Sequence, residues 1–506
     1  MTDPFGYDYC RVRANGTVSY DSFNGDIEFN VNNNESERWI SPKNSYLSIR
    51  LRIVQTDEAG TAGCLQPVVN ADDGTHSKAH ATLVSIPYVN PNPAACLFQA
   101  VTFNIGEETI SNNQNLAPCN TLYRTLYESE AEQRSVNSTN AIKYMTITDT
   151  DIGATKTAVL ADYFPATYGA TAGTTLSNRK LWALKNMMGF NKYNEVEINT
   201  QCFAPIMYSD DCIPSNTPFS IRLTTDPNFY YNLVNIAGSN VSTLPNDGAV
   251  NLTIGRLTSA SSNTGTANNI SVAVVDMNLW LHRVHMPNSK IPKEIYIKQY
   301  SATVHTITGQ HDEFNIDFKK NRRLTHIACA FIQKKGAMKC CPTDFSSGYY
   351  IGAINGTTDT PSAAATTEAI TYSNSPIAQL LNIRIEYAGS VYPFQPYNYN
   401  FDYTTKGGGQ SNGNYRAFYD YCNYSDGLRD RSGTLLDMSQ YSVAPIVLFK
   451  TFQNPDNDGN NCLCTVDFKT ASNITNNCYL LVMAMYDEVC TIHFDEFAKY
   501  KGFEIH

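Results

Sequence analysis

Hydrophobic and polar residues alternate along several stretches of this chain with the two-residue period of a β-strand. The stretch from Ser45 to Gln55 is the clearest case, with aliphatic residues on one face and polar residues on the other: Leu47, Ile49, Leu51 and Ile53 against Ser48, Arg50 and Arg52. Such a strand packs one face on a core and turns the other to solvent or to a neighbouring molecule.

Further strands are predicted on the same grounds. The long stretch Ile270 to Met286 is expected to collect Val275, Met277, Leu279 and Leu281 on one face. Leu324 to Gln333 is a nearly continuous apolar strand, and Lys192 to Tyr208 is also expected to return to strand. Many strands joined by polar loops are therefore predicted along the whole chain.

A unit of strand, turn, short strand and helix lies between Phe98 and Arg134. The first strand is broken at Gly106, and the helix is expected to be capped by Asn120 or Thr121. The apolar face of the strand is expected to consist of Val101, Phe103 and Ile105. One face of the helix is expected to consist of Leu122, Tyr123, Leu126 and Tyr127.

A second version of this unit lies between Ala378 and Arg431. Gly389 breaks its strand, and Asn414 is expected to open its helix. The corresponding strand face consists of Ile383, Ile385 and Tyr387. The corresponding helix face consists of Tyr415, Phe418, Tyr419 and Cys422. A recurrent unit of this kind indicates a duplication.

The elements that flank the two units recur in the same order. Ile49 is matched with Ile327, Pro205 with Pro445, and Val272 with Leu480, while the intervening loops differ in length. Strands that are kept while loops are resized are typical of two copies of one fold. We therefore predict an all-β protein of two tandem eight-stranded antiparallel jelly rolls with one short helix in each, at residues 1–286 and 287–506.

The composition narrows the classes of function. The 506 residues carry a net charge of -10 and the pI is near 5.4, which argues against direct wrapping of nucleic acid. No charged-then-apolar signal opens the chain, and the apolar run Cys478 to Met485 is too short to span a bilayer. Synthesis in a cytosol-like compartment is expected, with the 14 cysteines mostly reduced.

No catalytic, cofactor-binding or metal-binding residue is predicted, and the chain is not expected to be an enzyme. His282 and His285 point to opposite faces of a strand, and Gly407 to Gly409 lacks the residues of a phosphate loop. The stretch Asp456 to Gly459 is interpreted as a turn, and calcium binding at subunit interfaces is kept as an alternative. The basic cluster Lys319 to Arg323 reads as a solvated turn.

The string Phe98 to Gly106, followed by Asn115 to Arg134 with Thr121-Leu122-Tyr123-Arg124 and Tyr127-Glu128, resembles the first jelly roll of double jelly-roll major capsid proteins. The likeness is to those of Polinton-like viruses and virophages, with adenovirus hexon more distant. Through the ordered repeat, the resemblance covers essentially the whole chain, which lacks hexon's very large inserted towers.

The resemblance implies a major capsid protein that forms homotrimeric, pseudo-hexagonal capsomers in the icosahedral shell of a double-stranded DNA virus. The implied partners are neighbouring capsomers, penton proteins and minor capsid proteins, without specific nucleic-acid binding or a membrane span. The implied location is the virion, after synthesis in the host-cell cytoplasm or a viral factory. The loops Glu58 to Pro93, Ser135 to Phe190 and Met338 to Ser375 are then candidates for the exterior, and Met1 to Arg13 for an arm that reaches a neighbouring capsomer.

Two alternatives remain at this stage. A non-virion assembly scaffold of the same fold, similar to the poxvirus type, would have the same sequence pattern. A jelly-roll carbohydrate-binding protein would use aromatic rings as flat platforms, and the chain has 32 Tyr and 23 Phe.

Overall fold

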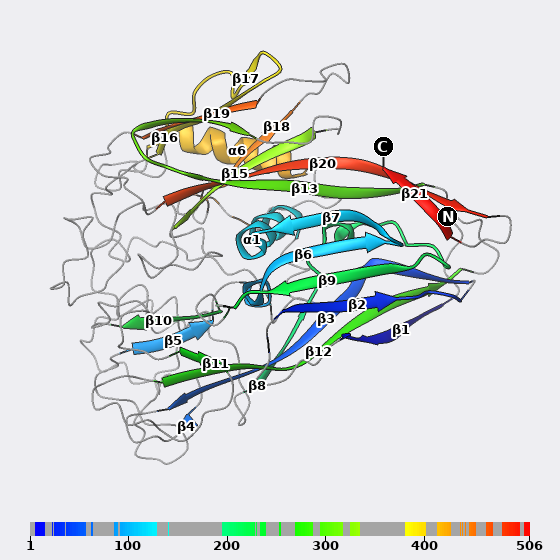
Figure 1. The fold of residues 1–506 in the computed structure, drawn as a ribbon. Coiled ribbons are helices and arrows are strands. Elements are labelled where there is room, and N and C mark those ends of the chain that lie inside the picture. The colour runs from blue at the N-terminus through cyan, green and yellow to red at the C-terminus, as the bar shows by residue number, and fades with distance from the viewer. Residues whose placement is uncertain are drawn as a thin grey trace.

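The computed structural model describes residues 6–15, 23, 25–35, 37–56, 62–63, 85–89, 92–128, 140, 195–227, 229, 233–238, 252–254, 269–286, 294–316, 324–333, 380–400, 412–426, 436, 438, 441, 445–451, 462–468, 478–495 and 500–505. The described part of the chain forms four larger antiparallel sheets, which are stacked one above another in Figure 1. The prediction of an all-β fold is confirmed.

Two of these sheets come from the first half of the chain. The β3 sheet has the order β1 (Gly6–Arg13), β12 (Asn269–His285), β3 (Arg38–Thr56) and β8 (Glu195–Thr200), with β4 (Ala62–Gly63) and β11 (Leu252–Ile254) at its margin. The β6 sheet has the order β2 (Asp26–Val31), β9 (Phe219–Thr225), β6 (Phe98–Ile105) and β7 (Glu108–Gln114). A separate pair is formed by β5 (Ser85–Val89) and β10 (Val234–Gly238).

The other two sheets come from the second half. The β15 sheet has the order β13 (Glu294–Thr306), β20 (Cys478–Phe494), β15 (Leu324–Gln333) and β18 (Val447–Lys450), with β21 (Tyr500–Ile505) beside β20. The β16 sheet has the order β14 (His311–Ile316), β19 (Cys462–Phe468), β16 (Leu380–Tyr387) and β17 (Ser390–Tyr392).

The two halves share one topology. If the eight main strands of each half are numbered along the chain, one sheet has the order 1-8-3-6 and the other 2-7-4-5, in both halves. Each half also places its helix between its fifth and sixth main strands: α1 (Leu116–Tyr127) and α6 (Asn412–Asp426). This strand order is that of a jelly roll, so the predicted fold of two tandem jelly rolls is confirmed.

Strand register supports most of the predicted matches. Ile49 of β3 lies opposite Met277, and Ile327 of β15 lies opposite Ala484, so the third and eighth strands of the two halves correspond. The match of Pro205 with Pro445 is wrong. Pro205 begins a 3-10 turn, η4 (Pro205–Tyr208), after the sixth strand, whereas Pro445 precedes the sixth strand of its half. The predicted strand from Lys192 to Tyr208 accordingly ends at Thr200.

The predicted face of the long strand β12 is wrong at one position. Val274 is fully buried and Val275 is only partly so, because the pairing with β3 is irregular between Val274 and Asp276. An irregularity of this kind shifts the alternation by one residue, so Val272 and Val274 precede Met277, Leu279 and Leu281 on the core face.

Both helices begin earlier than predicted. α1 starts at Leu116 after Asn115, whose φ of 52° is left-handed, so Asn120 and Thr121 lie inside the helix rather than at its cap. α6 starts at Asn412, and its buried face is Asn414, Ala417, Tyr421 and Ser425. The predicted face is wrong at Tyr415 and Tyr419, which are exposed, whereas Phe418 and Cys422 are partly buried against the core.

The prediction that Met1 to Arg13 forms an arm toward a neighbouring capsomer is wrong for residues 6–13. Gly6 to Arg13 is strand β1, which pairs along its full length with β12.

The predicted exterior loops lie almost entirely outside the described residues, as do Lys319 to Arg323, Gly407 to Gly409 and Asp456 to Gly459. Neither helix of the described part is long and apolar enough to cross a membrane.

Candidate functional site

The two jelly rolls meet where helix α1 of the first packs on the β15 sheet of the second (Figure 1). Leu122, Tyr123 and Leu126 are fully buried and belong to the same apolar cluster as Ala328, Met483 and Met485 of that sheet. The predicted helix face is confirmed, and its partner is the second jelly roll.

Aromatic rings fill the centre of this contact. The ring centroid of Tyr123 lies 5.1 Å from that of Tyr300 on β13 and 4.9 Å from that of Tyr208 in η4. The ammonium of Lys298 lies 4.9 Å from the centroid of Tyr127. Burial raises the pKa of the Tyr123 hydroxyl well above its ordinary value, so the phenol is neutral where the two jelly rolls touch.

Hydrogen bonds attach the first jelly roll to strand β13. The hydroxyl of Ser209 donates to the backbone oxygen of Tyr296 at 2.7 Å, and the backbone N–H of Tyr296 donates to the carboxylate of Asp211 at 2.7 Å. The side-chain amide of Gln299 donates to the backbone oxygen of Ile110 at 3.2 Å. These bonds pair backbone groups of β13 and β7 with the opposite half of the chain.

The N-terminal end of β13 and the C-terminal end of β20 pack on the first jelly roll. Ile295, Ile297, Cys490 and Ile492 are buried in the cluster that holds the first core. The hydroxyl of Tyr500, on β21, donates to the backbone oxygen of Ile105 at 3.2 Å. Apolar and polar contacts thus join the two jelly rolls into one unit.

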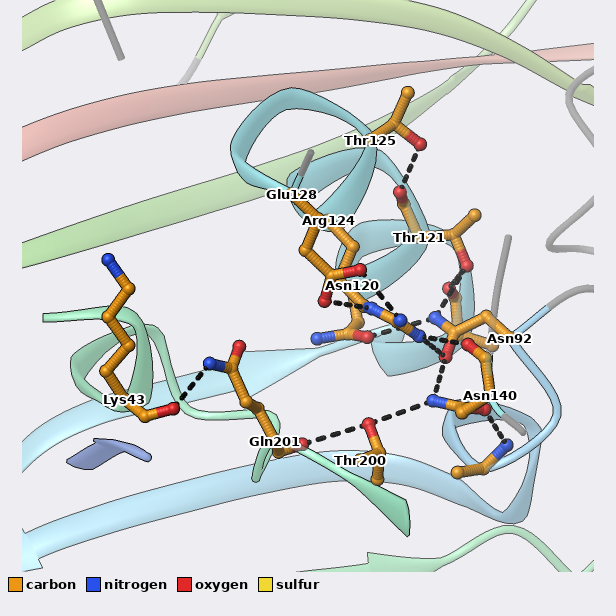
Figure 2. A network of polar contacts seen from close by, with 12 residues as sticks. Lys43, Asn92, Asn120, Thr121, Arg124, Thr125, Glu128, Asn140, Thr200 and Gln201 are labelled. Atoms are coloured by element: carbon orange, nitrogen blue, oxygen red, sulfur yellow. Dashed lines mark hydrogen bonds and ion pairs between the residues drawn. The ribbon is translucent and has the colours of Figure 1, made fainter. Parts of the chain in front are cut away.

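A buried arginine lies on the side of α1 that faces its own jelly roll (Figure 2). Arg124 is fully buried and donates two hydrogen bonds to the carboxylate of Glu128, at 2.6 and 2.8 Å. It also donates to the side-chain oxygen of Asn92 at 2.8 Å and to the backbone oxygen of Asn140 at 2.6 Å. A buried charge is tolerated when it is paired and its donors are satisfied in this way.

Amide side chains extend this network to the sixth strand. Asn140 donates to Asn92 and to the hydroxyl of Thr200, each at 2.9 Å. Asn92 donates in turn to Asn120 and Thr121 of α1, each at 2.9 Å (Figure 2). The network therefore fixes the helix against β8 and against the residues that precede β6.

Sequence reasoning named Arg124 within a motif and missed its burial. The signal available was an Arg and a Glu four residues apart on a helix, at positions 124 and 128. That spacing is also common on exposed helices, and the partners Asn92 and Asn140 are remote in the sequence.

The outward face of the β3 sheet carries a group of aromatic side chains. Tyr7 and Tyr9 of β1 are 73% and 45% exposed. The ring of Tyr9 lies 5.0 Å from that of His282 and 5.8 Å from that of Tyr46, which stacks at 6.3 Å on Trp280. Arg11, Arg50 and Arg52 lie on the same face, where Arg11 pairs with Asp276 at 3.9 Å and Arg52 pairs with Glu195.

A second group of exposed aromatic residues lies around α6. Tyr415 and Tyr419 are 48% and 66% exposed, and Phe394, which follows β17, is 90% exposed. Arg416 donates to the backbone oxygen of Gln395 and lies over the ring of Tyr397, so the segment after β17 is held against the helix. Large exposed rings that gather on one element often mark interaction surfaces.

The histidines singled out in the sequence have ordinary neighbours. His285 bonds the carboxylate of Glu37 at 2.8 Å, while His282 lies among the rings of Tyr7 and Tyr9. Within the described residues, no group of three or more His, Cys, Asp or Glu side chains is placed to hold a metal ion. Ten cysteines of the described residues are free thiols.

Comparison with known proteins gives a likeness of fold. The chain is similar to a chain in the cryo-EM structure of the Sputnik virophage, with a TM-score of 0.50 and 11% identity, over 100% of this chain and 89% of that one. It is also similar to the Faustovirus major capsid protein, with a TM-score of 0.49 and 9% identity, over 97% and 91%. The crystal structure of the mavirus major capsid protein is similar with a TM-score of 0.47 and 10% identity, over 100% of this chain and 92% of that one.

No protein-family model matches the sequence, and no curated protein matches it. The repeated strand order and the similarity to the Sputnik virophage chain define the class of fold: the protein is a double jelly roll.

Proposed function

We propose that this chain is a major capsid protein, and that three copies form a capsomer of pseudo-hexagonal outline in the icosahedral shell of a double-stranded DNA virus. The observation that carries the proposal is one jelly-roll topology repeated twice in a chain and held as a unit by α1. Three such chains around a threefold axis place six similar sandwiches in a ring. The similarity of fold to a Sputnik virophage chain supports this function.

The partners in this proposal are two further copies in the trimer, neighbouring capsomers, and penton and minor capsid proteins. The protein would reside in the virion after synthesis in the host-cell cytoplasm or a viral factory, without a catalytic role or specific nucleic-acid binding. We place the division between the jelly rolls at residues 286 and 287. In support, β12 ends at His285 and β13 begins at Glu294, in different sheets.

Quantitative mass spectrometry of purified mature particles tests the proposal against the scaffold alternative. We expect this chain to be the most abundant protein of the mature particle. Its presence in immature particles and loss from mature ones would instead establish the scaffold role.

A further inference from the structure

The contact between the two jelly rolls of one chain joins a helix to the outer face of a sheet. Cys329 and Phe331 of β15 point into their own sandwich, since Cys329 contacts Cys464 and the ring of Phe331 lies 6.0 Å from that of Phe468. Ala328 and Ala330 alternate with them and are nevertheless fully buried. Their face is covered because α1 lies on it, which explains why β15 is apolar on both faces.

The equivalent parts at the two outer sides of the chain carry large exposed side chains within the described residues. On α6, Tyr419 lies two residues from both Ala417 and Tyr421, so it points away from the jelly roll against which those residues are buried. The β3 sheet, equivalent to the β15 sheet, presents polar and aromatic residues on its outer face, including Arg50 and the exposed ring of Tyr9. In the described part of the chain, one helix face and one sheet face therefore expose large side chains.

Strand register identifies the residues that correspond between the two sheets. Met277 corresponds to Ala484, because they lie opposite the matched residues Ile49 and Ile327. Counting three residues along each strand makes Trp280 correspond to Asp487.

Their partners on the neighbouring edge strand correspond as well. Trp280 lies opposite Arg11, and Asp487 lies opposite Lys298. Lys298 is the cation that lies over the ring of Tyr127 on α1. Arg11 is thus the equivalent cation on the free sheet.

We propose that α6 of one copy packs on the outer face of the β3 sheet of a second copy, as α1 packs on the β15 sheet within the chain. This inference rests on the proposed capsomer, and it names the two surfaces that join its subunits. Tyr415 and Tyr419 are placed against Arg11, Trp280 and Tyr46, with Arg11 over a tyrosine ring. Tyr, Trp and Arg are the side chains that interfaces favour.

The same arrangement explains how the assembly closes. A helix that binds the next sheet makes a head-to-tail contact, which forms a ring when the rotation per unit closes. In a trimer, the six helix-on-sheet contacts are of two kinds: three through α1 within chains and three through α6 between them. The intrachain contact is apolar and permanent, whereas the intersubunit contact is exposed before assembly and consequently more polar.

The first experiment measures the mass of the full chain by light scattering for the unchanged protein and two variants. Tyr415→Arg/Tyr419→Arg places two cations opposite Arg11, so we expect a folded monomer with unchanged circular dichroism. Tyr296→Arg is the matched control, because the Tyr296 side chain is 64% exposed, against 66% for Tyr419, and its described hydrogen bonds run through its backbone. The control is expected to keep three times the chain mass.

The second experiment locates the partner of α6. With Tyr419→p-benzoylphenylalanine, illumination of the trimer should give linked chains whose cross-linked peptide contains residues of β1 or β12. Linkage confined to other segments, or a Tyr415→Arg/Tyr419→Arg trimer, would overturn the inference and leave the proposed capsomer standing. A monomeric unchanged protein would overturn both.

Discussion

Arg124 of α1 and Glu128, which directly follows the helix, form a two-pronged ion pair, with 0% and 3% of their side chains exposed. The pair lies beneath the helix that joins the two jelly rolls. Its geometry therefore affects both the first core and the position of the second jelly roll.

Replacing one partner of this pair is expected to destabilise the fold more than replacing both. Arg124→Met or Glu128→Leu alone should lower the free energy of unfolding by about 3–5 kcal/mol, because each leaves a buried charge without its partner. The double variant should lose less than the sum of the two single losses. Urea unfolding of the four proteins measures this coupling, and strictly additive losses would show that the two side chains act independently.

Acid sensitivity is expected at His326 in the β15 sheet. Burial lowers its pKa from 6.5 to about 4, with Lys450 and Lys298 adding to the effect. The unfolded chain then binds a proton between pH 6.5 and 4 that the folded chain does not, so stability rises with pH across this window and falls on acidification.

The loss in the free energy of unfolding caused by His326 should approach about 3 kcal/mol below pH 4. Unfolding free energies of the unchanged protein and His326→Leu, measured from pH 7 to 4, give the test. The variant should lose less stability over this range, and equal losses in the two proteins would exclude His326 as the cause.

The turn between β6 and β7 should tolerate only glycine. Gly106 has a φ of +59°, and a Cβ there would lie 2.7 Å from ring atoms of Tyr500. Gly106→Ala should cost about 1–3 kcal/mol through backbone strain and displacement of that ring. Gly25→Ala is the control for strain alone, since Gly25 has a φ of +85° and its Cβ would meet nothing within 4 Å. Equal melting temperatures for the two variants would contradict a close approach of Tyr500.

Deletion of residues 1–13 should damage the fold of the first jelly roll. It removes strand β1 and with it the pairing on that edge of β12 from Gly6 opposite His285 to Arg13 opposite Asn278. Deletion of residues 1–5 is the control, because it leaves β1 in place. Thermal unfolding should show a large loss for the longer deletion, and equal melting temperatures for the two would show that β1 is dispensable.

Strands whose two faces differ in polarity were predictable from the sequence. The alternation at Leu47, Ile49 and Leu51 requires a core on one side, and the structure buries all three residues completely. The run from Leu324 to Gln333 was equally clear, although its apolar character on both faces reflects the distant helix α1.

Features that depend on distant partners were not predictable. The irregular pairing beside Val275 changes which residues face the core without changing the local composition. On α6, tyrosines occur on both faces, so periodicity could not tell the buried Tyr421 from the exposed Tyr419. The pairing of β1 with β12 joins segments at opposite ends of one jelly roll, and the short alternation from Tyr7 to Arg13 was the only local sign.

The most direct test of the central claim is the mass of the purified, untagged chain by light scattering, with negative-stain images of the same peak. The account predicts three times the 56.2 kDa chain mass and particles of hexagonal outline. A peak at the chain mass, with no hexagonal particles in its images, would contradict the capsomer and with it the proposed function.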